Sequence, residues 1–66
     1  MSKDTLQGRE IIIEFFPIGQ YMKVSAIDTA TLTEVVTQGP VSAGKEALKH
    51  NAVKRLEYVL KKKGLI

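Results

Sequence analysis

The residues whose spacing comes closest to known chemistry are 39–46, GPVSAGKE, which fit the pattern GxxxxGK of a phosphate-binding loop. Such a loop binds nucleotides because its backbone amides and lysine contact phosphate oxygens while a Ser or Thr hydroxyl binds Mg²⁺. Here Glu46 occupies the hydroxyl position, where a carboxylate repels phosphate, and Pro40 stiffens the loop. The motif also belongs to a parallel sheet with crossover helices, for which 66 residues are too few. We therefore expect no bound nucleotide, and interpret the segment as the end of a strand followed by a helix with Ser42 at its N-cap.

Other chemistry-bearing residues do not form a catalytic constellation. His50 is the single histidine, and its helical position places it on a solvated face among charged residues. No serine stands in a visible arrangement with a histidine and an acid. The chain has no cysteine, which excludes disulfides and thiolate metal sites, and one histidine cannot build a zinc site. We expect a protein that is not an enzyme and that carries no cofactor or metal.

The charge is unevenly distributed along the chain. Residues 1–42 contain three basic and five acidic residues, whereas residues 43–66 contain seven basic and two acidic ones. Basic residues interleaved with an aromatic can contact a nucleic-acid backbone or an acidic protein. The candidates for such an anion-binding or nucleic-acid-binding surface are Lys54, Arg55, Tyr58, Lys61 and Lys62. The alternative is a solubilising lysine face whose last turn complements the helix dipole.

These residues are positioned by three strands and one helix. The β-branched and aromatic content predicts strands over 10–16, 21–28 and 33–38, joined by four-residue loops at 17–20 and 29–32. Leu32 is unusual, because a loop of this shape commonly has Gly or Asn at its left-handed position. Apolar residues at helical spacing predict one helix over about 42–63, with Gly64 just beyond its end. The fold class is therefore α+β: a three-stranded antiparallel β-meander packed on one C-terminal helix, with residues 1–8 as a flexible arm and 9–66 as a single domain.

The loop lengths set a pairing register and two sheet faces. Four-residue loops pair Phe16 with Tyr21, Glu14 with Lys23, and Asp28 with Thr33. One face then collects apolar residues that suit the helix, namely Ile11, Ile13, Phe15, Met22, Val24, Ala26, Val35 and Thr37. The opposite face also contains too many apolar residues for a solvated surface: Ile12, Phe16, Tyr21, Ile27 and Val36.

Three interpretations of the second apolar face remain open. Residues 1–8 can fold over it, or β-propensity alone can account for its composition. The chain can also self-associate as a homodimer, through this face or through the edge of the first or third strand. The third interpretation is that the face docks on a different protein partner. We expect an interaction module, with nucleic-acid binding by the basic helix as the alternative. The sheet itself is not expected to bind in a DNA groove, because the acidic residues on its outer face repel phosphate.

Four segments of the chain resemble a known family. They are Glu14-Phe15-Phe16-Pro17-Ile18-Gly19, Lys23-Val24-Ser25-Ala26-Ile27-Asp28, Thr33-Glu34-Val35 and Lys54-Arg55-Leu56-Glu57-Tyr58-Val59-Leu60. Together they resemble a family of very small, uncharacterised alphaproteobacterial proteins, a domain of unknown function. Such relatives commonly read Thr-Gly-Thr where this chain has Thr31-Leu32-Thr33. The resemblance implies a bacterial cytoplasmic setting, and it implies no activity or site residues.

The sequence gives no sign of a membrane or export segment. The first ten residues lack an apolar stretch of the kind a signal peptide has. No apolar run approaches the roughly 18 residues of a membrane span. We accordingly expect a cytoplasmic protein without a membrane partner.

Overall fold

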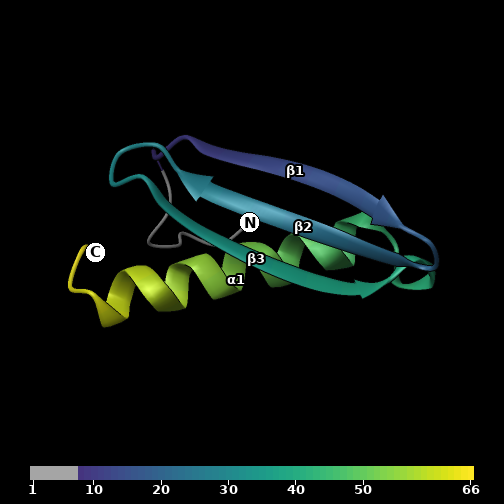
Figure 1. The fold of residues 1–66 in the computed structure, drawn as a ribbon. Coiled ribbons are helices and arrows are strands. Elements are labelled where there is room, and N and C mark those ends of the chain that lie inside the picture. Colours follow the sequence, from purple (N-terminus) through teal and green to yellow (C-terminus); the bar gives the residue numbers. More distant parts are fainter. Residues whose placement is uncertain (1–7) are drawn as a thin grey trace.

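The computed structural model describes residues 8–66 as one antiparallel sheet with a helix packed on one of its faces (Figure 1). The strands are β1 (Ile11–Ile18), β2 (Tyr21–Asp28) and β3 (Thr33–Pro40), in the order β1-β2-β3. A 3₁₀ turn (Val41–Ala43) leads into α1 (Lys45–Lys62). The predicted α+β meander with a C-terminal helix is confirmed. The predicted arm lies outside the described residues except for Gly8.

The core forms where α1 lies across the inner face of the sheet, mainly over β2 and β3. Four helix residues at i, i+4 spacing are buried: Leu48, Ala52, Leu56 and Leu60. They pack against Met22, Val24, Ala26 and Val35, with Ile11, Ile13 and Phe15 of β1 partly buried beside them. Burial of a Leu or Val side chain stabilises a fold by about 1.5–3 kcal/mol, so this single layer is the main source of cohesion. The predicted inner face is confirmed.

The two hairpins differ in how well their registers were predicted. Asp28 pairs with Thr33, as expected. In the first hairpin Phe16 pairs with Lys23 and Glu14 with Ser25, so the predicted register is wrong by two residues. The turn consists of Gly19 and Gln20 alone, with Gly19 at a φ of 58°. A two-residue hairpin turn needs a positive φ at its first central residue, and glycine adopts this conformation without steric cost.

Both prolines lie inside strands, which explains why the strands are longer than predicted. The backbone N–H of Thr29 donates to the carbonyl of Glu10, and that of Val41 donates to the carbonyl of Gln20. Since bonded residues alternate along an antiparallel pair, Pro17 and Pro40 fall at positions that face away from β2. A proline there removes no bond from the ladder, so β1 continues through Pro17 to Ile18 and β3 extends as far as Pro40.

The helix begins later than predicted and ends as predicted. Ser42 lies in the 3₁₀ turn, and the N-cap is Gly44, at a φ of 90° and without a side-chain cap. The expectation of Ser42 as N-cap is therefore wrong, because the chain leaving β3 needs this extra turn before it reverses direction. At the other end the N–H of Leu65 donates to the carbonyl of Leu60, and Gly64 has a φ of 73°. This is a Schellman ending with glycine at C′.

Two backbone positions are tightly constrained. Leu32 has a φ of 60° and is the one non-glycine residue with a positive φ in the described part of the chain, which confirms that it is out of place in its loop. Gly39 lies under the helix, where an added Cβ would approach within 2.6 Å of Leu48 Cδ2. Any larger residue at position 39 must displace this buried leucine.

Candidate functional site

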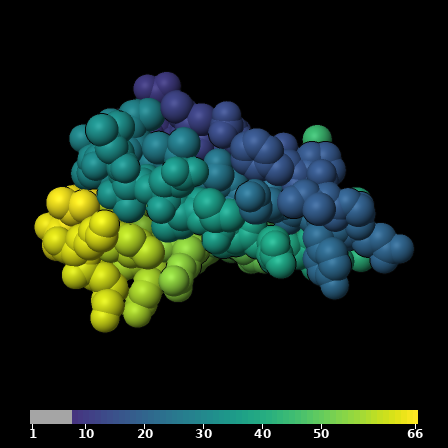
Figure 2. All heavy atoms as spheres, viewed as in Figure 1, coloured from purple at the N-terminus to yellow at the C-terminus, as the bar shows by residue number. Residues whose placement is uncertain are grey.

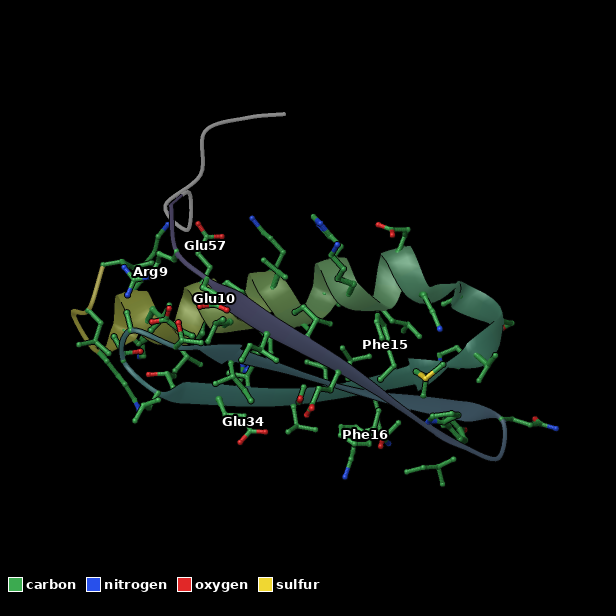
Figure 3. The ribbon with its side chains drawn as sticks, turned by 90° about the horizontal axis from the view of Figure 1, so that it is seen from above. Arg9, Glu10, Phe15, Phe16, Glu34 and Glu57 are labelled. Atoms are coloured by element: carbon green, nitrogen blue, oxygen red, sulfur yellow. The ribbon has the colours of Figure 1, made fainter. Side chains whose placement is uncertain are left out.

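The face of the sheet that points away from α1, called the outer face below, carries exposed apolar side chains. In Figure 3, Phe15 points toward α1 whereas Phe16 and Glu34 point away from it. Phe16 is 42% exposed and Tyr21 is 57% exposed, and Ile12 and Val36 are also exposed. Ile27, in the central strand, is half-buried. All five residues that the sequence singled out thus lie on the outer face.

Ile18 belongs to the same surface and was missed. It pairs with Tyr21 at the end of the first hairpin and is exposed. The prediction placed it in a turn because Pro17 was taken to end the strand. Its even position along β1, shared with Ile12 and Phe16, is the signal that identifies its face once the strand is extended.

Charged side chains divide the outer face. Lys23 Nζ lies 5.8 Å from the centroid of the Phe16 ring, close enough for a cation–π contact. The expected pairing of Glu14 with Lys23 is wrong, because the true register places Glu14 opposite Ser25. Glu14 and Glu34 are also exposed on this face, Glu34 in the same cross-strand row as Ile12 and Ile27, and Glu14 in the next row.

Ser25 lies at the centre of the outer face, beneath its neighbours. It is 2% exposed, and it pairs with Glu14 on one side and Val36 on the other. Within residues 8–66 its Oγ is the one buried side-chain oxygen or nitrogen without a hydrogen-bond partner. A small residue covered by its neighbours makes the middle of this surface continuous rather than hollow.

The predicted basic surface of α1 divides into two groups. Lys54 and Lys61 flank Glu57, with their Nζ atoms 3.4 and 3.7 Å from its carboxylate oxygens. Arg55 and Lys62 flank Tyr58, at 5.7 and 6.0 Å from the ring centroid. Tyr58 is exposed, so the second group presents an aromatic ring between two cations on the surface. Such a group can stack on a base and contact a phosphate.

A buried ion pair that the sequence prediction missed joins the start of β1 to the end of β2. Arg9 donates from Nε to Asp28 Oδ1 at 3.2 Å and from Nη2 to Oδ2 at 2.9 Å. The hydroxyl of Thr31 donates to the same Oδ2 at 2.7 Å. These hydrogen bonds, first that of Arg9 and then that of Thr31, lower the pKa of Asp28 to about 2. Because every partner stabilises the ionised form in a closed network, this cluster holds the loop rather than performing chemistry.

The single histidine and the segment 39–46 were the other chemical candidates in the sequence. His50 is exposed on α1. Between Gly8 and Ile66, no group of three or more His, Asp or Glu side chains is placed to hold a metal ion. The same region contains no helix with the length and apolar content that crossing a bilayer requires. The segment 39–46 forms the end of β3, the 3₁₀ turn and the start of α1, as the strand-to-helix interpretation predicted.

Comparison with known proteins identifies a family. The sequence model of a family described as a domain of unknown function (DUF6898) matches residues 8–63. This range includes the whole sheet and all of α1. No curated protein and no solved structure matches the chain.

Proposed function

The chain belongs to the DUF6898 family of domains of unknown function, and from this premise we propose that it is a small non-enzymatic interaction module. It self-associates, or docks on a protein partner, through the outer face of its sheet. We also assign it to the bacterial cytoplasm, on the resemblance of its four segments to alphaproteobacterial proteins.

One observation supports this proposal above the others. Five large apolar side chains are exposed on the face opposite the helix: Ile12, Phe16, Ile18, Tyr21 and Val36. An exposed apolar surface of this kind lowers the solubility of a small protein unless a partner or a second copy covers it.

The size of the outer face sets the expected strength of self-association. Three strands of eight residues span roughly 14 Å by 26 Å, from about 4.8 Å per strand and 3.3 Å per residue. A standard stable interface buries about 800 Å² on each partner, which is more than this footprint provides. We therefore expect a weak, concentration-dependent dimer rather than an obligate one.

Sedimentation velocity from about 10 to 500 µM protein tests the dimer, since weak association appears only in the upper part of this range. The sedimentation coefficient of the wild type should rise with concentration, and that of Phe16→Asp should stay constant. Tyr58→Asp is the matched control, because it places the same charge at an exposed aromatic on α1. A wild type that remains monomeric throughout contradicts self-association, and a Phe16→Asp variant that still dimerises removes the outer face from it.

The alternative function is nucleic-acid binding by the basic helix, through Lys54, Arg55, Tyr58, Lys61 and Lys62. It is favoured by one arrangement, the exposed Tyr58 ring between Arg55 and Lys62. Fluorescence anisotropy with single-stranded DNA and RNA at about 50 and 200 mM salt tests it, because phosphate contacts weaken steeply over this range. Binding at low salt that Tyr58→Ala abolishes supports this function, and no binding at low salt excludes it.

A further inference from the structure

A groove of about 420 Å³ lies between β3 and α1. One wall is formed by residues 31–36, from the β2–β3 loop and the first half of β3. The other wall is formed by Arg55 and Val59 in the second half of α1 and by Lys63 just beyond its end. Figures 1 and 2 face this side, where the teal of β3 meets the yellow-green of the helix.

The strand in this groove has an open edge. β3 pairs with β2 on one side, and within residues 8–66 no strand pairs with it on the other. The bond from the Val41 N–H to the Gln20 carbonyl identifies the odd-numbered residues of β3 as those that bond to β2. The N–H and C=O groups of Glu34, Val36 and Gln38 therefore point outward. An extended peptide can add to such an edge as a further strand.

The charges beside the open edge select the kind of peptide. Arg55 and Lys63 are exposed cations on the helix wall, with the half-buried Val59 between them. In a strand added beside β3, side chains alternate between the α1 side and the outer side. Those on the α1 side meet the two cations, so acidic residues fit there. Those on the outer side lie beside Val36 and Glu34, where an uncharged β-branched residue fits.

The same charges disfavour a second copy of this chain in the groove. Two β3 strands paired edge to edge around a two-fold axis would place their helices side by side under the joined sheet. Since α1 contains six basic and two acidic residues, the two helices would bring like charges together, and like charges at an interface oppose association. An acidic peptide in the groove would instead be attracted by these basic residues.

Leu32 marks one end of the groove. It is 79% exposed and has a positive φ. Both its apolar contact with water and its left-handed backbone conformation are therefore unfavourable. An asparagine or glycine would avoid both costs. A large, exposed apolar side chain at such a position fits a contact with a bound partner.

We propose that the groove between β3 and α1 binds an extended peptide with acidic residues at alternate positions, which adds as a fourth strand to the open edge of β3. The backbone groups of Glu34, Val36 and Gln38 pair with the peptide. Arg55 and Lys63 bind its carboxylates, and Leu32 contacts an apolar residue at its end. This groove adjoins the outer face at Glu34 and Val36, but the proposal does not depend on the function proposed for that face.

Binding is tested with two fluorescein-labelled heptapeptide pools. The first has Asp or Glu at positions 2, 4 and 6 and a mixture of Val, Ile, Leu and Thr at the others. The second has Lys in place of every acid. Fluorescence anisotropy should show saturable binding of the acidic pool and at least about tenfold weaker binding of the lysine pool, since two ion pairs contribute on this scale. Equal binding of the two pools, or no binding of either, overturns the proposal.

Variants of the helix locate the site. Arg55→Glu with Lys63→Glu should weaken binding of the acidic pool by about tenfold or more. Lys49→Glu with Lys54→Glu is the matched control, because it makes the same change of charge on α1 outside the groove, and it should bind nearly as the wild type does. If both pairs weaken binding equally, attraction to the whole helix explains it and the groove is excluded.

Amide hydrogen exchange identifies strand addition directly. Saturating acidic pool should slow exchange at the N–H groups of Glu34, Val36 and Gln38 by about tenfold or more, as a newly formed ladder does. The edge amides of Ile11, Ile13 and Phe15 serve as the internal control and should be unchanged. Protection of the β1 amides, or no protection while the peptide binds, contradicts the proposal. The same protection at high protein concentration without peptide also contradicts it, because the occupant of the edge is then a second copy of the chain.

Discussion

Arg9 and Asp28 form a two-point ion pair at the open end of the first hairpin, with N–O distances of 3.2 and 2.9 Å. The side chain of Asp28 is fully buried and that of Arg9 is 22% exposed. Thr31 and Thr33 extend the network, their hydroxyl oxygens lying 2.8 Å apart. The pair therefore joins the residues before β1, the end of β2 and the β2–β3 loop into one unit.

Acid should weaken the fold through Asp28. Its pKa is about 2 in the folded protein and 3.8 in the ordinary state, so the unfolded chain takes up the proton first as the pH falls. The stabilisation is fully present above about pH 4 and is lost as the pH falls toward 2. Asp28→Asn should lower the urea midpoint at neutral pH, and the gap to the wild type should close by about pH 2. Glu34→Gln, at an exposed acid, should follow the wild type; a gap for Asp28→Asn that is independent of pH contradicts the assignment.

Leu32→Asn should stabilise the protein. A left-handed backbone costs a branched residue about 1 kcal/mol more than asparagine, and the leucine side chain is exposed. We expect the free energy of unfolding to rise by about 0.5–1 kcal/mol, measured by urea denaturation. Ala30→Asn, at an exposed position of the same loop without a positive φ, should give no such gain. The same Leu32→Asn variant should bind the acidic peptide pool more weakly.

Gly39→Ala should destabilise the protein through Leu48. The added methyl group overlaps Leu48 Cδ2, and overpacking of this kind costs about 1–3 kcal/mol. Combining it with Leu48→Ala should cost less than the sum of the two single changes, since truncating the leucine removes the clash. Gln38→Ala, at the exposed neighbour, should stay within about 0.5 kcal/mol of the wild type. Additive losses in the double variant would exclude the contact.

The register of the first hairpin predicts which residue couples to Lys23. A double-mutant cycle between Phe16→Leu and Lys23→Met should give a coupling free energy of about 0.5 kcal/mol, typical of an exposed cation–π contact. The equivalent cycle between Glu14→Gln and Lys23→Met should give a value near zero. The reverse result would restore the register with a four-residue loop.

The sequence predicted the elements of this fold better than their ends. The stripe Leu48, Ala52, Leu56 and Leu60 identifies α1 because its period matches one buried helix face. The first hairpin failed because Pro17 is ordinarily a turn residue, and whether a proline interrupts a strand depends on which way its nitrogen faces. The error was two residues, an even number, so every side chain kept its face and the inner and outer faces were still assigned correctly.

The candidate surfaces were predictable to different degrees. The outer face follows from alternation alone, which is why its five residues could be named in advance. The Arg9–Asp28 pair also had a signal, because both residues fall on the inner face at the same end of the sheet. The groove beside β3 had no signal in the sequence, because it depends on where α1 lies across the sheet. That position is decided by side-chain packing and not by the spacing of apolar residues along the helix.

Pro17 and Pro40 have a consequence for polymerisation. Each stands at the end of an outer strand where its missing N–H faces away from β2, after a run of three outward-facing donors. A strand that adds to either edge finds only this short run before the proline. Edge-to-edge stacking of many copies, the geometry by which sheets grow into fibres, therefore stops early on both sides. Each outer strand thus has, beside its last turn or loop, one position that cannot donate a hydrogen bond to another copy.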